Sequence, residues 1–214
     1  MTTLLESKKK CAICGHEQKY TEVGSTNTFG GYMDLDTRPP QMKRSTLIYD
    51  IQMCEKCAYS NGDISELISG INSEDLKTAN YKAVFNDGGI DEHAKAFLLA
   101  GYLYQRVNQH MVAGIYYLNA AWVFDDSEDK DHAKRARNKA IDNISKYVEE
   151  SADINFGAMT VDLYRRNGRF KEAKETAEQL IDYGVEDILK KVLKLQIRLC
   201  DDNDDSCHTV EETL

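Results

Sequence analysis

The sequence predicts an α+β protein that is mainly α-helical, with a small β region at the N-terminus followed by antiparallel helical hairpins. Three observations lead to this prediction. Two C-x-x-C pairs lie within the first 62 residues. Both prolines, Pro39 and Pro40, lie there as well, with five of the 13 glycines. From Asp63 onward the chain contains no proline, and its apolar residues recur at helical spacing.

These changes divide the chain into a β region at residues 1–62, a helical region at 63–200 and an acidic tail at 201–214. In the β region, the apolar residues of 46–53 alternate like a strand that leads into the second cysteine pair. The tail has six acidic residues and no Lys or Arg, which predicts a flexible segment.

Capping residues and breaks place the expected helix ends. Asp63–Glu66 has a capping-box pattern, and Ser73 with the two acids after it predicts another helix start. Asp91 predicts the start of a helix of about 16 residues. Further helices are expected at about 111–124, 129–150, 154–167, 170–183 and 186–200, with breaks at Gly168 and Gly184.

The helical region has part of the pattern of tetratricopeptide repeats, in which small residues lie where paired helices touch and large ones lie between them. With Gly101 at the glycine of the repeat, its other key positions hold Phe97, Tyr104, Ala113, Tyr117 and Ala120. A second match, through Tyr164, Gly168 and Ala173, is offset by 60 residues rather than the usual spacing of about 34. A plain helical bundle would show similar spacing, so this alternative stays open.

Two pairs of cysteines, Cys11 with Cys14 and Cys54 with Cys57, have the spacing of metal-binding knuckles. Each C-x-x-C turn points two sulfur atoms at one ion, and two turns supply the four thiolates of a closed structural zinc site. We therefore expect one zinc ion in an N-terminal zinc ribbon. A redox role would need a reactive pair that opens a helix in a βαβ setting, which neither pair has. The knuckle form also favours a single ion over an iron–sulfur cluster.

Outside these pairs, Cys200, Cys207 and His208 could form a second metal clip near the C-terminus. We expect free thiols instead, because a flexible tail offers no preorganised partner for them.

The loop between the knuckles combines carboxylates and arginines: Asp34, Asp36, Arg38 and Arg44. Two prolines stiffen the chain after Arg38. We expect the four charged side chains to pair locally and fix the shape of the loop. The alternative is that Arg38 and Arg44 stay free to bind an anionic group, which makes the four residues a candidate ligand site.

The pattern C-x-x-C-G, then F-G-x-x-D-L-D-x-R-P-P-x-M-x-R-S-T, then C-x-x-C-x-Y, resembles that of a family of uncharacterised prokaryotic proteins. Besides the four cysteines, the matching positions are Phe29, Gly30, Asp34, Leu35, Asp36, Arg38, Pro39, Pro40, Met42, Arg44, Ser45 and Thr46. The resemblance implies a zinc ribbon joined to a tetratricopeptide-like helical region, and it implies no activity. Ala58 departs from the usual pattern, because such knuckles mostly have glycine at this position.

The net charge of −9 is unevenly spread along the chain. Residues 1–62 contain eight Lys and Arg against seven Asp and Glu, which leaves −10 on the remainder. Because an acidic helical region repels phosphate backbones, nucleic acid is not an expected partner. No apolar run approaches the roughly 18 residues that span a bilayer, and residues 1–10 lack the pattern of a secretory signal. We therefore expect no membrane contact and a cytoplasmic protein, whose six cysteines stay reduced.

Neither a phosphate-binding glycine loop, a nucleophile with a paired base nor an open zinc site is recognisable, so we expect no enzymatic activity. The function that the sequence favours is a zinc-stabilised scaffold that binds a protein or peptide. A nucleic-acid-associated zinc-ribbon factor, using Lys8, Lys9 and Lys10, is the first alternative, and an enzyme of unknown reaction is the second.

In the repeat alignment, the first helix of each hairpin lines a concave surface. The candidate partner-binding residues on that surface are Lys95, Tyr102, Arg106, Arg165 and Arg166. Together they would form a positive strip for an extended peptide with acidic residues or a free C-terminal carboxylate. The alternative is that these arginines only neutralise nearby Asp and Glu side chains.

Overall fold

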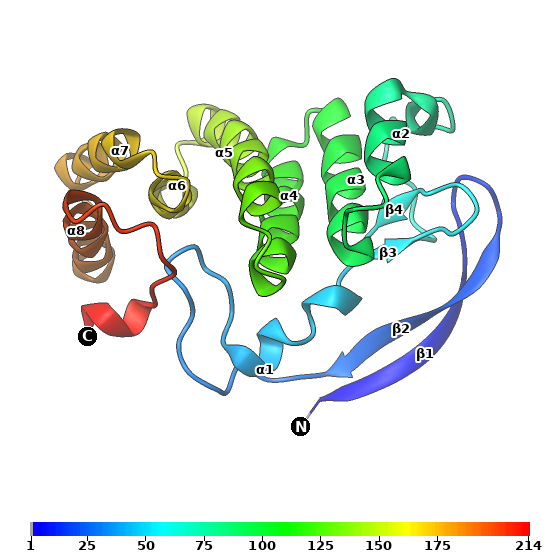
Figure 1. Ribbon diagram of the computed structural model, residues 1–214, viewed down its shortest axis with the longest axis horizontal. Coiled ribbons are helices and arrows are strands. Elements are labelled where there is room, and N and C mark those ends of the chain that lie inside the picture. Colours follow the sequence, from blue (N-terminus) through cyan, green and yellow to red (C-terminus); the bar gives the residue numbers. More distant parts are fainter. Residues whose placement is uncertain (1) are drawn as a thin grey trace.

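The computed structural model describes residues 2–214, and its N-terminal part contains two antiparallel hairpins (Figure 1). Strand β1 (Thr3–Lys10) pairs with β2 (Glu17–Ser25), and β3 (Gln52–Met53) pairs with β4 (Ser60–Asn61). The turn inside each hairpin contains one of the two cysteine pairs, which is the arrangement expected of a ribbon.

Between β2 and β3 the chain forms a long loop, the short helix α1 (Gln41–Arg44) and a 3-10 helix at Leu47–Tyr49. The expected strand at 46–53 is therefore wrong for most of its length, and extended pairing begins only at Gln52. Leu47 and Ile51 both enter the core. Residues four apart lie on one face of a helical turn and of a strand alike, so their burial could not tell the two apart in the sequence.

Seven helices follow the ribbon in the described residues. They are α2 (Ala79–Asn86), α3 (Glu92–Arg106), α4 (His110–Asp126), α5 (Lys130–Ser151), α6 (Ile154–Arg166), α7 (Phe170–Tyr183) and α8 (Asp187–Asp201). The last six agree with the expected helices within about two residues at each end. Asp91, Asp129 and Asp153 cap α3, α5 and α6 by accepting backbone N–H groups.

The two helix starts expected before α3 are wrong. Asp63 accepts hydrogen bonds from Ser65 in a turn and pairs with Lys9 of β1, so its side chain does not cap a helix. After Ser73 the chain makes a short 3-10 helix at Asp75–Lys77, and Thr78 caps α2. The Asp63 carboxylate is used for hydrogen bonds within a loop, and such local hydrogen bonds compete with helix capping.

Successive helices pack as hairpins, α3 on α4, α4 on α5, α6 on α7 and α7 on α8. Gly101 lies against the Tyr117 ring, where an added Cβ would be 3.0 Å from the ring atoms. Gly114 of α4 lies even closer to α5, since its Cβ would be 2.5 Å from Ile144 Cγ1. Gly101 allows the close approach that the spacing of small and large residues predicted, and Gly114 is a second close contact that this spacing did not identify.

The ribbon and the first helices share one apolar core. Tyr59 beside the second knuckle and Tyr81 of α2 are both fully buried, and Leu99 and Leu103 of α3 belong to the same cluster. The Tyr81 hydroxyl donates to the Ala58 carbonyl at 2.7 Å. The ribbon is thus packed directly on the helices, and the domain boundary expected near residue 62 carries no free linker.

Residues 26–40, which we call the strap, run beneath the row of helices from the end of β2 to the C-terminal segment (Figure 1). Leu35 of the strap is buried against Leu195 and Leu199 of α8. Its backbone N–H donates to the His208 carbonyl, and Asp34 forms a β-bridge with Thr209. The strap therefore connects the end of β2 to the C-terminal segment.

The C-terminal residues differ from the flexible tail expected from their charge. They form a turn and a 3-10 helix at Val210–Thr213 that contacts the strap. Arg165 of α6 holds this segment by donating to the carbonyls of Asp204 and Ser206 at 2.6 and 2.9 Å. Acidic composition is a poor guide here, because backbone pairing and a buried arginine order the segment.

None of the helices in residues 2–214 is both long enough and apolar enough to cross a membrane.

Candidate functional site

The two cysteine pairs lie in turns with the same backbone hydrogen bonds. In the first, the Cys11 N–H donates to the His16 carbonyl and the Gly15 N–H donates to the Cys11 carbonyl. In the second, the Cys54 N–H donates to the Tyr59 carbonyl and the Ala58 N–H to the Cys54 carbonyl. The two turns are therefore equivalent knuckles that face each other.

Both knuckles need a left-handed backbone at the residue after the second cysteine, with φ of +71° at Gly15 and +62° at Ala58. Glycine adopts this conformation without steric cost, whereas alanine is strained in it. The expected departure at Ala58 leaves the turn intact, because its N–H and carbonyl are both hydrogen-bonded.

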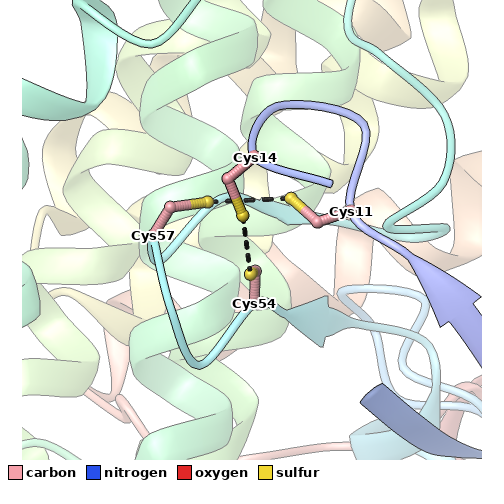
Figure 2. Close-up of side chains that lie close together, drawn as sticks. All are labelled: Cys11, Cys14, Cys54 and Cys57. Carbon is pink, nitrogen blue, oxygen red and sulfur yellow. Dashed lines mark hydrogen bonds between the residues drawn. The ribbon is translucent and has the colours of Figure 1, made fainter. Parts of the chain in front are cut away.

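The four sulfur atoms converge on one point (Figure 2). Cys11 Sγ lies 3.6 Å from Cys57 Sγ, Cys14 Sγ lies 3.6 Å from Cys54 Sγ, and all four lie within 4.8 Å of one another. Thiolates bound to zinc at about 2.3 Å would be roughly 3.8 Å apart at the corners of a tetrahedron. The four cysteines thus fit one tetrahedral metal ion and leave no position for a further ligand.

The thiols differ in how easily they ionise. Burial raises the pKa of Cys54 and of Cys57. Burial also opposes ionisation of Cys14, but the backbone N–H of His16 and the neighbouring thiols outweigh it and lower the pKa to about 7. Without a cation, four thiolates could not be packed together here, so the cluster favours a metal that replaces the protons.

The charged residues of the strap form a buried network instead of an open site. Asp36 is fully buried, and its carboxylate accepts from Trp122 Nε1 at 2.7 Å and from Arg166 Nη1 at 3.1 Å. Arg38 donates to Asp126 at 2.5 Å, and Arg44 donates to Asp34 at 2.7 Å. Of the two interpretations of the loop, these contacts match the one in which the charges fix its shape.

The network extends to the helices. Asp125 at the end of α4 accepts from Arg137 of α5 at 2.6 Å and from Arg166 of α6 at 2.9 Å. Burial opposes the charge of Arg166, but Asp36 and Asp125 beside it raise its pKa, so this guanidinium stays ionised. Sequence reasoning did not identify Trp122, Asp125 or Arg137, because no spacing pattern links them to the strap.

The family model described as "Uncharacterized protein conserved in bacteria (DUF2225)" matches residues 4–199. The chain belongs to this family. The matched residues include both knuckles, the strap and α2 to α7, and they end within α8, so the family assignment confirms the resemblance in the motifs. No curated protein and no solved structure matches the chain.

The five residues expected on one concave strip are not brought together in this member of the family. Arg165 is fully buried and donates to Asp162 and Gln196, so its guanidinium is closed to a partner. Arg166 belongs to the strap network, and Lys95 is buried beside Glu92. The expectation of a five-residue strip is corrected, since the second hairpin turns its arginines inward.

Tyr102 and Arg106, in contrast, line a groove between α2, α3 and α5 with a volume of about 510 Å³. Arg106 stacks on the Tyr102 ring at 5.9 Å and is paired with Asp75. Lys139 of α5 faces the same groove with its Nζ 5.2 Å from the centre of the Tyr117 ring. Lys139 is exposed as a whole residue, but desolvation in the groove lowers the pKa of its ammonium group. It forms no ion pair among the described residues, although the Asp142 carboxylate lines the same groove.

The remaining candidates lie near the C-terminus and do not form a metal clip. Cys200 is buried in α8, whereas Cys207 is exposed. His208 interacts with Asp204 at 2.9 Å and with Glu212 at 2.8 Å, so both ring nitrogens are used within the segment. Among the residues that the structure describes, the four ribbon cysteines form the one group with metal-ligand geometry.

Proposed function

We propose that the chain is a zinc-stabilised scaffold of the cytoplasm, which binds a protein or peptide in the groove between α2, α3 and α5 and performs no catalysis. The observation that carries the proposal is the groove itself. It is open, is lined by residues of α2, α3, α4 and α5, and combines aromatic surface with Lys139, which forms no ion pair among the described residues.

Zinc is the metal that best suits the ribbon. Four thiolates in a closed tetrahedral set are typical of structural zinc sites, and a saturated coordination sphere gives a substrate no access to the ion. A reducing compartment would keep the cysteines available for the metal. The ion would hold the ribbon against α2 and α3, which in turn form one wall of the groove.

The chemistry of the groove favours an acidic segment of the partner. Lys139 provides a partly desolvated ammonium group beside Tyr117, and the Tyr102 ring offers apolar surface. The polar side chains of Asn80 and Gln105 also line the groove and could bind the backbone of an extended peptide. A carboxylate paired with Lys139 would recover the solvation that the lysine loses in the groove.

A displayed library of random peptides, selected on the full-length zinc-loaded protein, tests this proposal. We expect selected peptides to share an acidic residue next to an apolar one. Lys139→Glu should weaken their binding about tenfold or more, because it places a like charge opposite the carboxylate. The matched control is Lys146→Glu. Lys146 is an exposed lysine of the same helix outside the groove, so its replacement should change the affinity less than about twofold.

The proposal fails if no peptide is selected, or if the selected peptides bind the Lys139→Glu and Lys146→Glu variants equally well. Metal analysis of the same preparation tests the other half of the proposal, with one zinc ion per chain as the expected result. A preparation that is folded without any metal would refute the structural role of zinc.

A further inference from the structure

A second cavity lies on the other side of the ion-pair network, where the end of α4, the start of α5, the end of α6 and the C-terminal segment meet. Its volume is about 300 Å³, and its charged lining residues are Asp125, Lys130, Lys134, Arg137, Arg166 and Asp205. Four cations therefore face two carboxylates, in a chain whose net charge is −9. Asp36 lies behind Arg166 and offsets one of these charges, so a positive excess remains.

The two arginines of this cavity have unused donors. The Arg137 and Arg166 side chains are 3% and 9% exposed, and the Nε of each has no hydrogen-bond partner. Their Nη atoms are held by Asp125 and Asp36, which fixes both guanidinium groups at the cavity wall. A buried donor without an acceptor is costly, and a bound anion is one way to satisfy it.

The lysines complete the arrangement from the solvent side. Lys130 lies in the first turn of α5, is exposed and has no carboxylate partner in the described residues. Lys134, one turn later on the same face, reaches Asp205 only at 3.6 Å. Both ammonium groups can therefore turn toward a ligand in the cavity.

We infer that this cavity binds a phosphate group, either inorganic phosphate or a phosphomonoester. Lysines and arginines approach from two helices in different directions, and a tetrahedral phosphate presents oxygens to all of them, whereas a carboxylate presents two oxygens in one plane. The charge of phosphate, about −1.5 to −2 near neutral pH, suits the positive excess of the lining.

The site is distinct from the peptide groove, with which it shares no lining residue. Charged residues of the strap and of the adjoining α1 also contribute to the surroundings of this site. The family-specific Asp36 positions Arg166, and Arg38 and Arg44 line an adjoining cavity that shares Lys130, Arg166 and Cys207 with the first.

Isothermal titration calorimetry of the full-length zinc-loaded protein with inorganic phosphate, at constant ionic strength set by KCl, tests the inference. We expect saturable binding of one phosphate per chain. The double variant Lys130→Gln and Lys134→Gln should weaken it about tenfold or more, and Lys146→Gln, on the same helix but outside the cavity, should leave it within about twofold. All three lysines are exposed, so the variants should fold like the parent.

Two further ligands define the chemical class. Glycerol phosphate should bind at least as well as inorganic phosphate if phosphomonoesters are the natural ligands, and weaker binding would assign the cavity to the free ion. Succinate should bind at least tenfold less tightly, as expected from its planar carboxylates. The inference is overturned if phosphate shows no saturation up to about 20 mM, if the double variant binds it as well as the Lys146→Gln control, or if succinate binds equally well.

Discussion

Removal of the Asp36 carboxylate should detach the strap from the helices. The Asp36→Ala change deletes the acceptor of Trp122 Nε1 and one of the two carboxylates that neutralise Arg166. A buried donor left unpaired costs about 1–3 kcal/mol, and breaking a buried ion pair costs about 3–5 kcal/mol. Because Asp125 still pairs with Arg166, and because burial and the nearby Asp162 raise the pKa of Asp36, the lower part of this range applies. We expect a loss of about 3 kcal/mol.

Urea unfolding followed by tryptophan fluorescence measures this loss directly, since Trp122 is the single tryptophan of the chain and contacts Asp36. The midpoint should fall, and m should decrease slightly because the detached strap already exposes surface in the native state. The melting temperature should drop by about 6–12 °C for a chain of this size. The native emission should also shift to longer wavelength as the strap exposes the indole ring.

The matched control is Asp50→Ala, which removes a half-exposed carboxylate that pairs with Lys43 at 3.4 Å. Its cost should stay below about 0.5 kcal/mol, because exposed ion pairs contribute little. If Asp36→Ala costs less than about 1 kcal/mol, or no more than the control, the buried network does not stabilise the strap.

Four further predictions concern the ribbon, the helix packing and the charge of the helical region. Cys14→Ser should abolish metal binding and unfold the ribbon, seen as loss of zinc in metal analysis and loss of dispersed amide signals, while Cys207→Ser should change neither. In the parent protein, zinc affinity should rise with pH, because protons compete for the thiolates. The rise should be steepest below about pH 7, where Cys14, Cys54 and Cys57 all carry protons, and should continue above neutral pH because the pKa values of Cys54 and Cys57 are raised; a pH-independent affinity would contradict this. Gly114→Ala should destabilise the protein by about 1–3 kcal/mol, because the new Cβ meets Ile144, whereas Gly88→Ala, with nothing within 4 Å, should stay within about 0.5 kcal/mol. Duplex DNA should not bind with a dissociation constant tighter than about 1 µM at physiological salt, and tighter binding in an anisotropy titration would restore the nucleic-acid alternative.

Local sequence patterns predicted the metal ligands and most helices. The C-x-x-C spacing specifies a turn that directs both sulfurs to one side, and the four sulfurs converge because two such turns face each other. The aspartate caps at 91, 129 and 153 act within one helical turn. Features that depend on neighbours along the chain were therefore available from the sequence.

The candidate binding residues were harder to place, because the direction of a side chain depends on which helices pack together. Arg106 and Arg166 have equivalent positions in the repeat alignment, yet Arg166 pairs with Asp36 of the strap and Arg106 lines a groove. Lys139 and Arg137 lie two residues apart on α5 and line two different cavities. Neither assignment follows from helical spacing alone.

The sequence by itself determined the ribbon cysteines, the succession of helices and the small residue at Gly101 that allows close packing. Only the tertiary structure decided that the strap and the C-terminal segment are joined, and that their charges are buried. Asp36 and Arg166 are 130 residues apart in the chain, and their pairing depends on packing between the strap and α6. Such long-range contacts carry no local signal, because a carboxylate in a loop and an arginine at a helix end are equally compatible with solvent until the fold removes the water between them.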